Sequence, residues 1–115
     1  MNEVEKNLLK NIQGAIQSGD YFFKCNDSPA LAFNIVQLDT FYKELFEEFP
    51  KYQYSGLIPS NTASDITRNR NKLAHELLLG DSATKIWNEL CTDLYQIDTK
   101  LKKILGDDYA IISEI

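Results

Sequence analysis

The stretch DSPALAFNIVQLDTFYKELFEEFP, residues 27–50, decides the fold class of this chain. Asp27 and Pro29 open it, and together they combine a capping side chain with a proline in the first helical turn. Apolar side chains then recur at helical spacing until Pro50, and the residue before a proline avoids the α region. These apolar positions are Leu31, Ile35, Leu38, Phe41, Tyr42, Leu45 and Phe49. The acidic positions expected on the solvated face are Asp39, Glu44, Glu47 and Glu48. The segment therefore predicts one long amphipathic helix.

Helical periodicity on both sides of this segment predicts three more helices. Residues 2–17 carry apolar side chains every four positions, and Gly19 is expected to end that helix. Tyr21, Phe22 and Phe23 are then expected to pack in the connector. Residues 63–79 predict the third helix, and residues 82–106 predict the fourth, with Gly106 at its end.

No segment alternates polar and apolar residues as a half-buried strand does. The prediction is an all-α antiparallel four-helix bundle that forms one domain over residues 1–115. The apolar stripes of the second and fourth helices are wide enough to include a dimer seam. The last nine residues, 107–115, receive no assignment.

Several classes of protein are excluded by what the sequence lacks. No apolar stretch approaches the 18 or more residues of a membrane span, and no signal peptide precedes the first helix, so we expect a cytoplasmic protein. Cys25 and Cys91 are isolated, and with one histidine they do not form a usual zinc site. We therefore expect neither a metal nor a cofactor. Trp87 is expected in the core or the dimer seam.

The arginines and the histidine of the chain are concentrated in one place. Its 115 residues include 12 basic and 17 acidic side chains, for a net charge of −5, which argues against a broad nucleic-acid-binding surface. Both arginines and the only histidine, however, fall within residues 68–75, a run with three cations and no acid. Since that run is +3, the rest of the chain is −8.

On a helical wheel this run presents a cationic face around the imidazole. Arg68, Lys72 and His75 share the face, and Asn71 is adjacent. An imidazole with a pKa near neutrality exchanges protons at a ribose 2′-hydroxyl or a leaving 5′-oxygen, and cations hold the phosphate. The face therefore suits phosphodiester cleavage, although a helix-surface histidine is more commonly only solvated.

Arg70 occupies a different position from the other cations. It falls on the predicted core stripe of Ile66, Leu73 and Leu77, where an arginine is costly unless its charge is paired or faces a cleft. A two-fold dimer in which Arg70 of one chain meets His75 of the other would supply such a cleft.

The segment Arg70-Asn-Lys-Leu-Ala-His75 resembles the signature of HEPN domains, an arginine followed by a polar residue and, after four to six intervening residues, a histidine. The resemblance implies a small all-α domain and a homodimeric, metal-independent endoribonuclease. Arg70 and His75 would be its catalytic pair, and Asn71 the polar residue after the arginine. Arg68 also stands at a permitted spacing, so the identity of the motif arginine stays open. Members paired with a nucleotidyltransferase often have tyrosine where this chain has Leu77.

The resemblance further implies RNA as the ligand and a place in a toxin–antitoxin or antiviral module, with an antitoxin or nucleotidyltransferase as partner. We expect Arg68, Asn71 and Lys72 to bind RNA phosphates. Tyr52 and Tyr54 could stack on bases, although loop packing is their default role. Two alternatives are a non-catalytic module that binds nucleotide, RNA or protein, and a small acidic antitoxin or immunity protein.

Overall fold

The computed structural model describes residues 1–76 and 82–106. This part of the chain is helical and contains no strand, which confirms the predicted all-α class. The elements are α1 (Glu3–Lys24), α2 (Ser28–Glu48), the short 3-10 helix η1 (Pro50–Gln53), α3 (Ser60–Glu76) and α4 (Ser82–Leu105). The third helix begins earlier than predicted, and residues 77–79 of the prediction lie outside the described residues.

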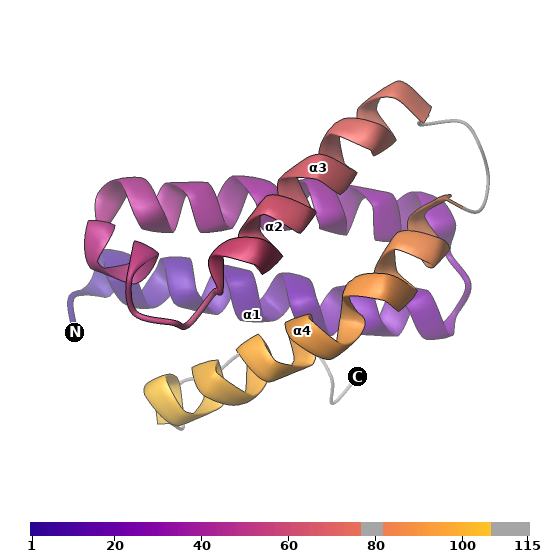
Figure 1. Ribbon diagram of the computed structural model, residues 1–115. Helices are drawn as coiled ribbons and strands as arrows, with labels where there is room; N and C mark the ends of the chain where they lie inside the picture. Colours follow the sequence, from indigo (N-terminus) through magenta and orange to yellow (C-terminus); the bar gives the residue numbers. More distant parts are fainter. Residues whose placement is uncertain (77–81, 107–115) are drawn as a thin grey trace.

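The four α-helices pack as a bundle. α1 and α2 lie side by side, α3 crosses α2 obliquely, and α4 packs obliquely across α1 (Figure 1). Gln13 near the middle of α1 contacts Asp98 of α4, whereas Asp20 farther along α1 contacts Tyr95. Because the contacts move backward along α4 as they move forward along α1, these two helices are antiparallel.

The ends of α2 follow the predicted signals. The Asp27 side chain accepts a hydrogen bond from the backbone N–H of Ala30 at 3.2 Å, and Pro29 lies in the first turn. At the other end α2 stops at Glu48, just before Pro50. The capping and proline signals therefore located this helix correctly.

The prediction for the end of α1 was wrong. The helix continues through Gly19 to Lys24, so Tyr21, Phe22 and Phe23 are helical and not part of a connector. Gly19 faces the ring of Trp87, and a Cβ atom at this glycine would lie 2.3 and 2.5 Å from two ring carbons. Trp87 is fully buried, as expected. The glycine therefore allows close packing of α1 on α4.

The first turn of α1 departs from its apolar pattern. Val4 is 55% exposed, whereas Glu5 is only 5% exposed and accepts a hydrogen bond from Tyr52 Oη at 2.5 Å. Lys51 Nζ lies 2.9 Å from the same carboxylate. Hydrogen bonds from Lys51 and Tyr52 hold the pKa of Glu5 below its ordinary value. Burial and the Glu5 hydrogen bond raise the pKa of Tyr52 to about 12. Because Tyr52 is 7% exposed, it is a packing residue, while Tyr54 is exposed.

All four α-helices contribute to one hydrophobic core. In the part of the chain that the structure describes, no helix is long and apolar enough to cross a membrane. Cys25 and Cys91 are unpaired thiols. Residues 107–115, which the sequence left unassigned, lie outside the described residues.

Candidate functional site

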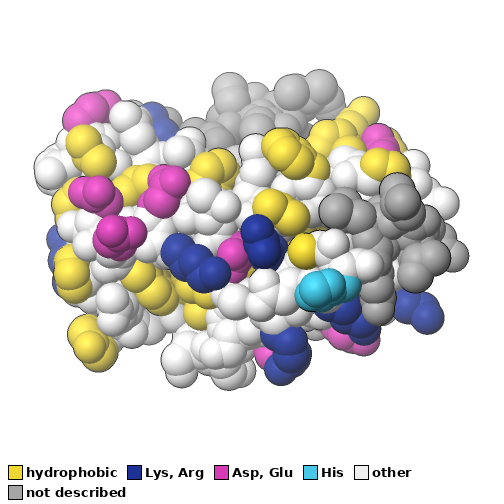
Figure 2. Space-filling view, turned by 90° about the horizontal axis from the view of Figure 1, so that it is seen from above, with side chains coloured by type: hydrophobic (Ala, Val, Ile, Leu, Met, Phe, Trp, Pro, Cys, Tyr) yellow, Lys and Arg dark blue, Asp and Glu magenta, His cyan; other side chains and the backbone are white. Residues whose placement is uncertain are grey.

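The outer face of α3 carries the cationic residues that the sequence singled out. Arg68, Asn71, Lys72 and His75 are exposed there, and Figure 2 shows the histidine at the surface with lysine and arginine side chains around it. The guanidinium of Arg68 pairs with Asp65 one turn earlier, with Nη2 2.7 Å from Oδ1. The Arg68 side chain remains 72% exposed, so this pair is a solvated one that a phosphate can replace at small cost.

Arg70 points toward α2 and not along this face. Its Nε lies 3.8 Å from Oδ2 of Asp39, and its Nη1 makes a long hydrogen bond of 3.4 Å to Asn71 Oδ1. Its neighbours on the stripe, Ile66 and Leu73, are both buried, while the Arg70 side chain is 42% exposed. The paired charge that an arginine needs at this position is therefore supplied by the same chain.

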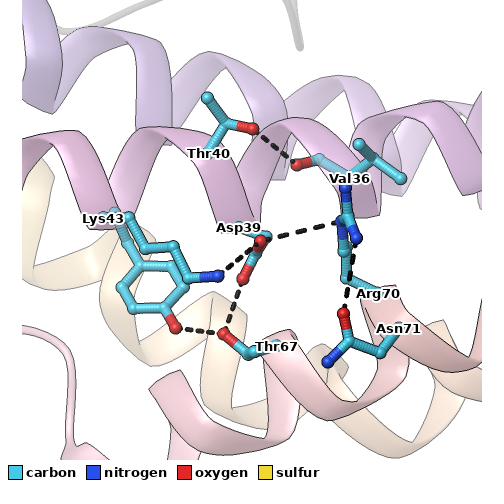
Figure 3. Close-up of polar contacts among 8 residues, drawn as sticks. Val36, Asp39, Thr40, Lys43, Thr67, Arg70 and Asn71 are labelled. Atoms are coloured by element: carbon cyan, nitrogen blue, oxygen red, sulfur yellow. Dashed lines mark hydrogen bonds and ion pairs between the residues drawn. The ribbon is translucent and has the colours of Figure 1, made fainter.

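The helical pattern of α2 predicts Asp39 on the solvated face, and this prediction is wrong. Asp39 is 5% exposed because Thr67 and Arg70 of α3 contact its carboxylate. Its carboxylate accepts a 2.6 Å hydrogen bond from Thr67 Oγ1, and the Thr67 hydroxyl is also hydrogen-bonded to the Tyr42 hydroxyl. Lys43 Nζ lies 3.0 Å from Asp39 Oδ2 (Figure 3). Asp39 is thus the polar centre of the α2–α3 interface, and the three acidic residues after it, Glu44, Glu47 and Glu48, are exposed as expected.

The two motif residues take different directions from one helix. Side chains five positions apart on a regular α-helix point about 140° apart. Arg70 accordingly faces Asp39 at the α2–α3 interface, whereas His75 is exposed to solvent. Arg68, in contrast, is about 20° from the direction of His75 on the same wheel. One chain therefore places His75 on the same face as Arg68, about 10 Å along the helix axis. A site that uses Arg70 with His75 needs a contribution from a second chain or a movement of these side chains.

Two cavities in the described part of the molecule are separate from α3. One of about 170 Å³ lies between α1 and α4 and is lined by Ile16, Gln17, Asp20, Tyr95, Asp98 and Lys102. The other, of about 350 Å³, is lined by the loop after η1 and the end of α4. Among the described residues, no group of three or more histidine, cysteine, aspartate or glutamate side chains is placed to hold a metal ion.

Comparison of the chain with models of known protein families, with curated proteins and with solved structures found no match. The resemblance to HEPN domains therefore rests on residues 70–75 and on the helical architecture.

Proposed function

We propose that this protein is an endoribonuclease of the HEPN type that acts as a homodimer. The observation that carries the proposal is the arrangement of α3: His75 is exposed, and the half-exposed guanidinium of Arg70 is held at Asp39. Both residues belong to the run 68–75, which contains both arginines and the only histidine of the chain and no acidic residue.

The proposed reaction is attack of a ribose 2′-hydroxyl on the adjacent phosphorus. The new bond joins the 2′-oxygen to phosphorus, and the bond from phosphorus to the 5′-oxygen breaks, which leaves a 2′,3′-cyclic phosphate and a 5′-hydroxyl. His75 accepts the 2′-hydroxyl proton, and the leaving 5′-oxygen takes a proton from the resulting imidazolium or from water. Arg70 binds the phosphate oxygens, on which negative charge develops in the transition state. Arg68, Asn71 and Lys72 bind flanking phosphates.

A dimer is part of the proposal because Arg70 and His75 of one chain point in different directions on α3, so that one chain does not bring the two side chains together. A two-fold axis near α3 would bring Arg70 of one protomer to His75 of its partner and produce two equivalent sites.

The first test is cleavage of a single-stranded RNA labelled with a fluorophore and a quencher, in the presence of EDTA. We expect His75→Ala to lower the rate by about 10²–10⁴-fold and Arg70→Ala by a similar factor. Lys103→Ala, a change on α4, is the matched control and retains the wild-type rate. Full activity of His75→Ala, or no cleavage by the folded wild-type dimer, would refute the catalytic proposal.

A mixing experiment tests the composite site. Arg70→Ala and His75→Ala are each inactive as homodimers, but a mixed dimer has one intact pair of Arg70 and His75 from different chains. Equal mixing and exchange of subunits should restore roughly a quarter of the wild-type rate, because half of the dimers are mixed and each has one of two sites. Mixed dimers without activity would show that the two residues act from the same chain.

A toxin or antiviral role, with an antitoxin or nucleotidyltransferase as partner, follows from the HEPN resemblance and belongs to this proposal. The charge of −8 outside the α3 run favours a second candidate, a module that binds RNA, a nucleotide or a protein without catalysis. The acidic surface is also compatible with an antitoxin or immunity protein. Saturable RNA binding without product would select the RNA-binding module, whereas a complex with a basic nuclease and no RNA binding would select the acidic partner protein.

A further inference from the structure

Two cations from different helices share one buried carboxylate. Lys43 Nζ on α2 and Arg70 Nε on α3 lie 3.0 and 3.8 Å from the same atom, Asp39 Oδ2. The distance between the two nitrogens is therefore at most the sum of these two distances. Figure 3 shows the lysine and the arginine approaching Asp39 from opposite sides.

The arrangement leaves donors free on the solvent side. The Asp39 side chain is 6% exposed, but those of Lys43 and Arg70 are 52% and 42% exposed. An ammonium group has three N–H donors and a guanidinium has five, and Asp39 and Asn71 use only some of them. Two cations against one carboxylate also leave a local charge of +1. Each phosphodiester of a nucleic-acid backbone has a charge of −1 and two free oxygens, so neighbouring phosphates can accept hydrogen bonds from the free donors of the two cations.

The relative direction of α2 and α3 determines the order of Lys43, Arg70 and His75 along their interface. Asp39 contacts Arg70, and Tyr42, farther along α2, contacts Thr67, which precedes Arg70 on α3. The two helices are therefore antiparallel, so Lys43 and His75 lie on opposite sides of Arg70 along the interface.

Lys43, Arg70 and His75 form a cationic path along the α2–α3 interface, and acidic residues lie beyond its Lys43 end. Glu44, Glu47 and Glu48 follow Lys43 on α2 and are exposed, and Figure 2 shows acidic side chains gathered toward one end of this surface. A polyanion that passes Lys43 along α2 would be repelled there. The path accordingly has room for a short stretch of nucleic-acid backbone.

We propose that Lys43 binds the RNA phosphate next to the one held by Arg70, so that the two cations at Asp39 form a two-phosphate subsite. This inference rests on the proposed function, since it takes the scissile phosphate to be at Arg70. Lys43 contributes binding and alignment of the strand, and takes no part in the proton transfers.

The test compares Lys43→Met with Lys103→Met in the full-length protein. The probe is an oligouridylate whose 2′-hydroxyls are methylated, so that it binds but is not cleaved, and affinity is read from fluorescence anisotropy. One lost phosphate contact should weaken binding about threefold to tenfold and reduce the slope of log K against log salt by about 0.7. Lys103→Met should leave both values unchanged. Lys43→Arg retains the charge and should restore them, which separates loss of the contact from damage to the fold.

A cleavable substrate separates this inference from the proposed function. Lys43→Met should raise KM for a long oligoribonucleotide with little change in kcat, while it cleaves a dinucleotide with a single phosphate like wild type. If wild type cleaves RNA but Lys43→Met retains its affinity and salt slope, the subsite is refuted and the nuclease stands. If wild type binds without cleaving and Lys43→Met weakens binding as stated, catalysis fails and the subsite stands. If wild type does not bind the probe, both are refuted.

Discussion

Replacement of Gly19 by alanine should destabilise the protein, although it occurs inside a helix. At an unconstrained helical position this change stabilises by about 1 kcal/mol, because glycine has the greater backbone freedom in the unfolded chain. Here the new Cβ atom would lie 2.3 and 2.5 Å from ring carbons of Trp87, which is fully buried. Overpacking of this kind costs about 1–3 kcal/mol or more. We therefore expect Gly19→Ala to lower the free energy of unfolding by about 1–2 kcal/mol.

Urea denaturation of a double-mutant cycle measures this effect and identifies its cause. Phenylalanine lacks the outer atoms of the indole that meet the new Cβ, so in a Trp87→Phe background the Gly19→Ala change should become neutral or stabilising. The interaction energy of the two changes should be about 2–3 kcal/mol. If Gly19→Ala stabilises the wild-type protein, or if the two changes add without coupling, the packing explanation is refuted.

The remaining predictions concern two buried polar contacts. Hydrogen bonds from Lys51 and Tyr52 lower the pKa of Glu5, so its contribution is present above the unfolded-state pKa and is lost as pH falls through the folded-state pKa. Glu5→Gln should therefore lower the free energy of unfolding by about 1.5–3 kcal/mol at pH 7, and this difference from wild type should shrink in acid. A difference that does not change with pH would contradict the assignment. Thr67→Val removes the hydroxyl that donates to Asp39 and should cost about 1.5–3 kcal/mol in thermal or urea unfolding, whereas an unchanged stability would show that water replaces this donor.

Local signals in the sequence predicted the helices wherever the signal was complete within a few residues. Asp27, Pro29 and Pro50 determine both ends of α2 without reference to the rest of the chain. Gly19 misled the prediction because its role depends on Trp87, which is 68 positions away in the sequence. A glycine that ends a helix and a glycine that admits an aromatic ring look the same in a sequence read alone.

The candidate site was predictable in part for a similar reason. The exposure of Arg68, Lys72 and His75 follows from helical periodicity alone, but the partner of Arg70 lies on another helix. Asp39 carried a usable signal, since it is four residues after Ile35 and falls within the apolar stripe of α2. A charged residue within such a stripe indicates a partner of opposite charge at the helix interface. Arg70 lies on the predicted core stripe of the third helix and is such a partner.

The helix that carries the candidate site is held less by apolar burial than its neighbours are. Among its described residues, α3 buries the apolar side chains Ala63, Ile66 and Leu73, whereas α4 buries eight residues. A polar contact centred on Asp39 also attaches α3 to α2. Detachment of α3 thus exposes fewer apolar side chains of its own than detachment of α4 would, and its amides should exchange with solvent through an opening that costs less than global unfolding. A polyanion bound across Lys43 and Arg70 would link α2 to α3 and slow that exchange. The ligand would thus stabilise the surface on which it binds.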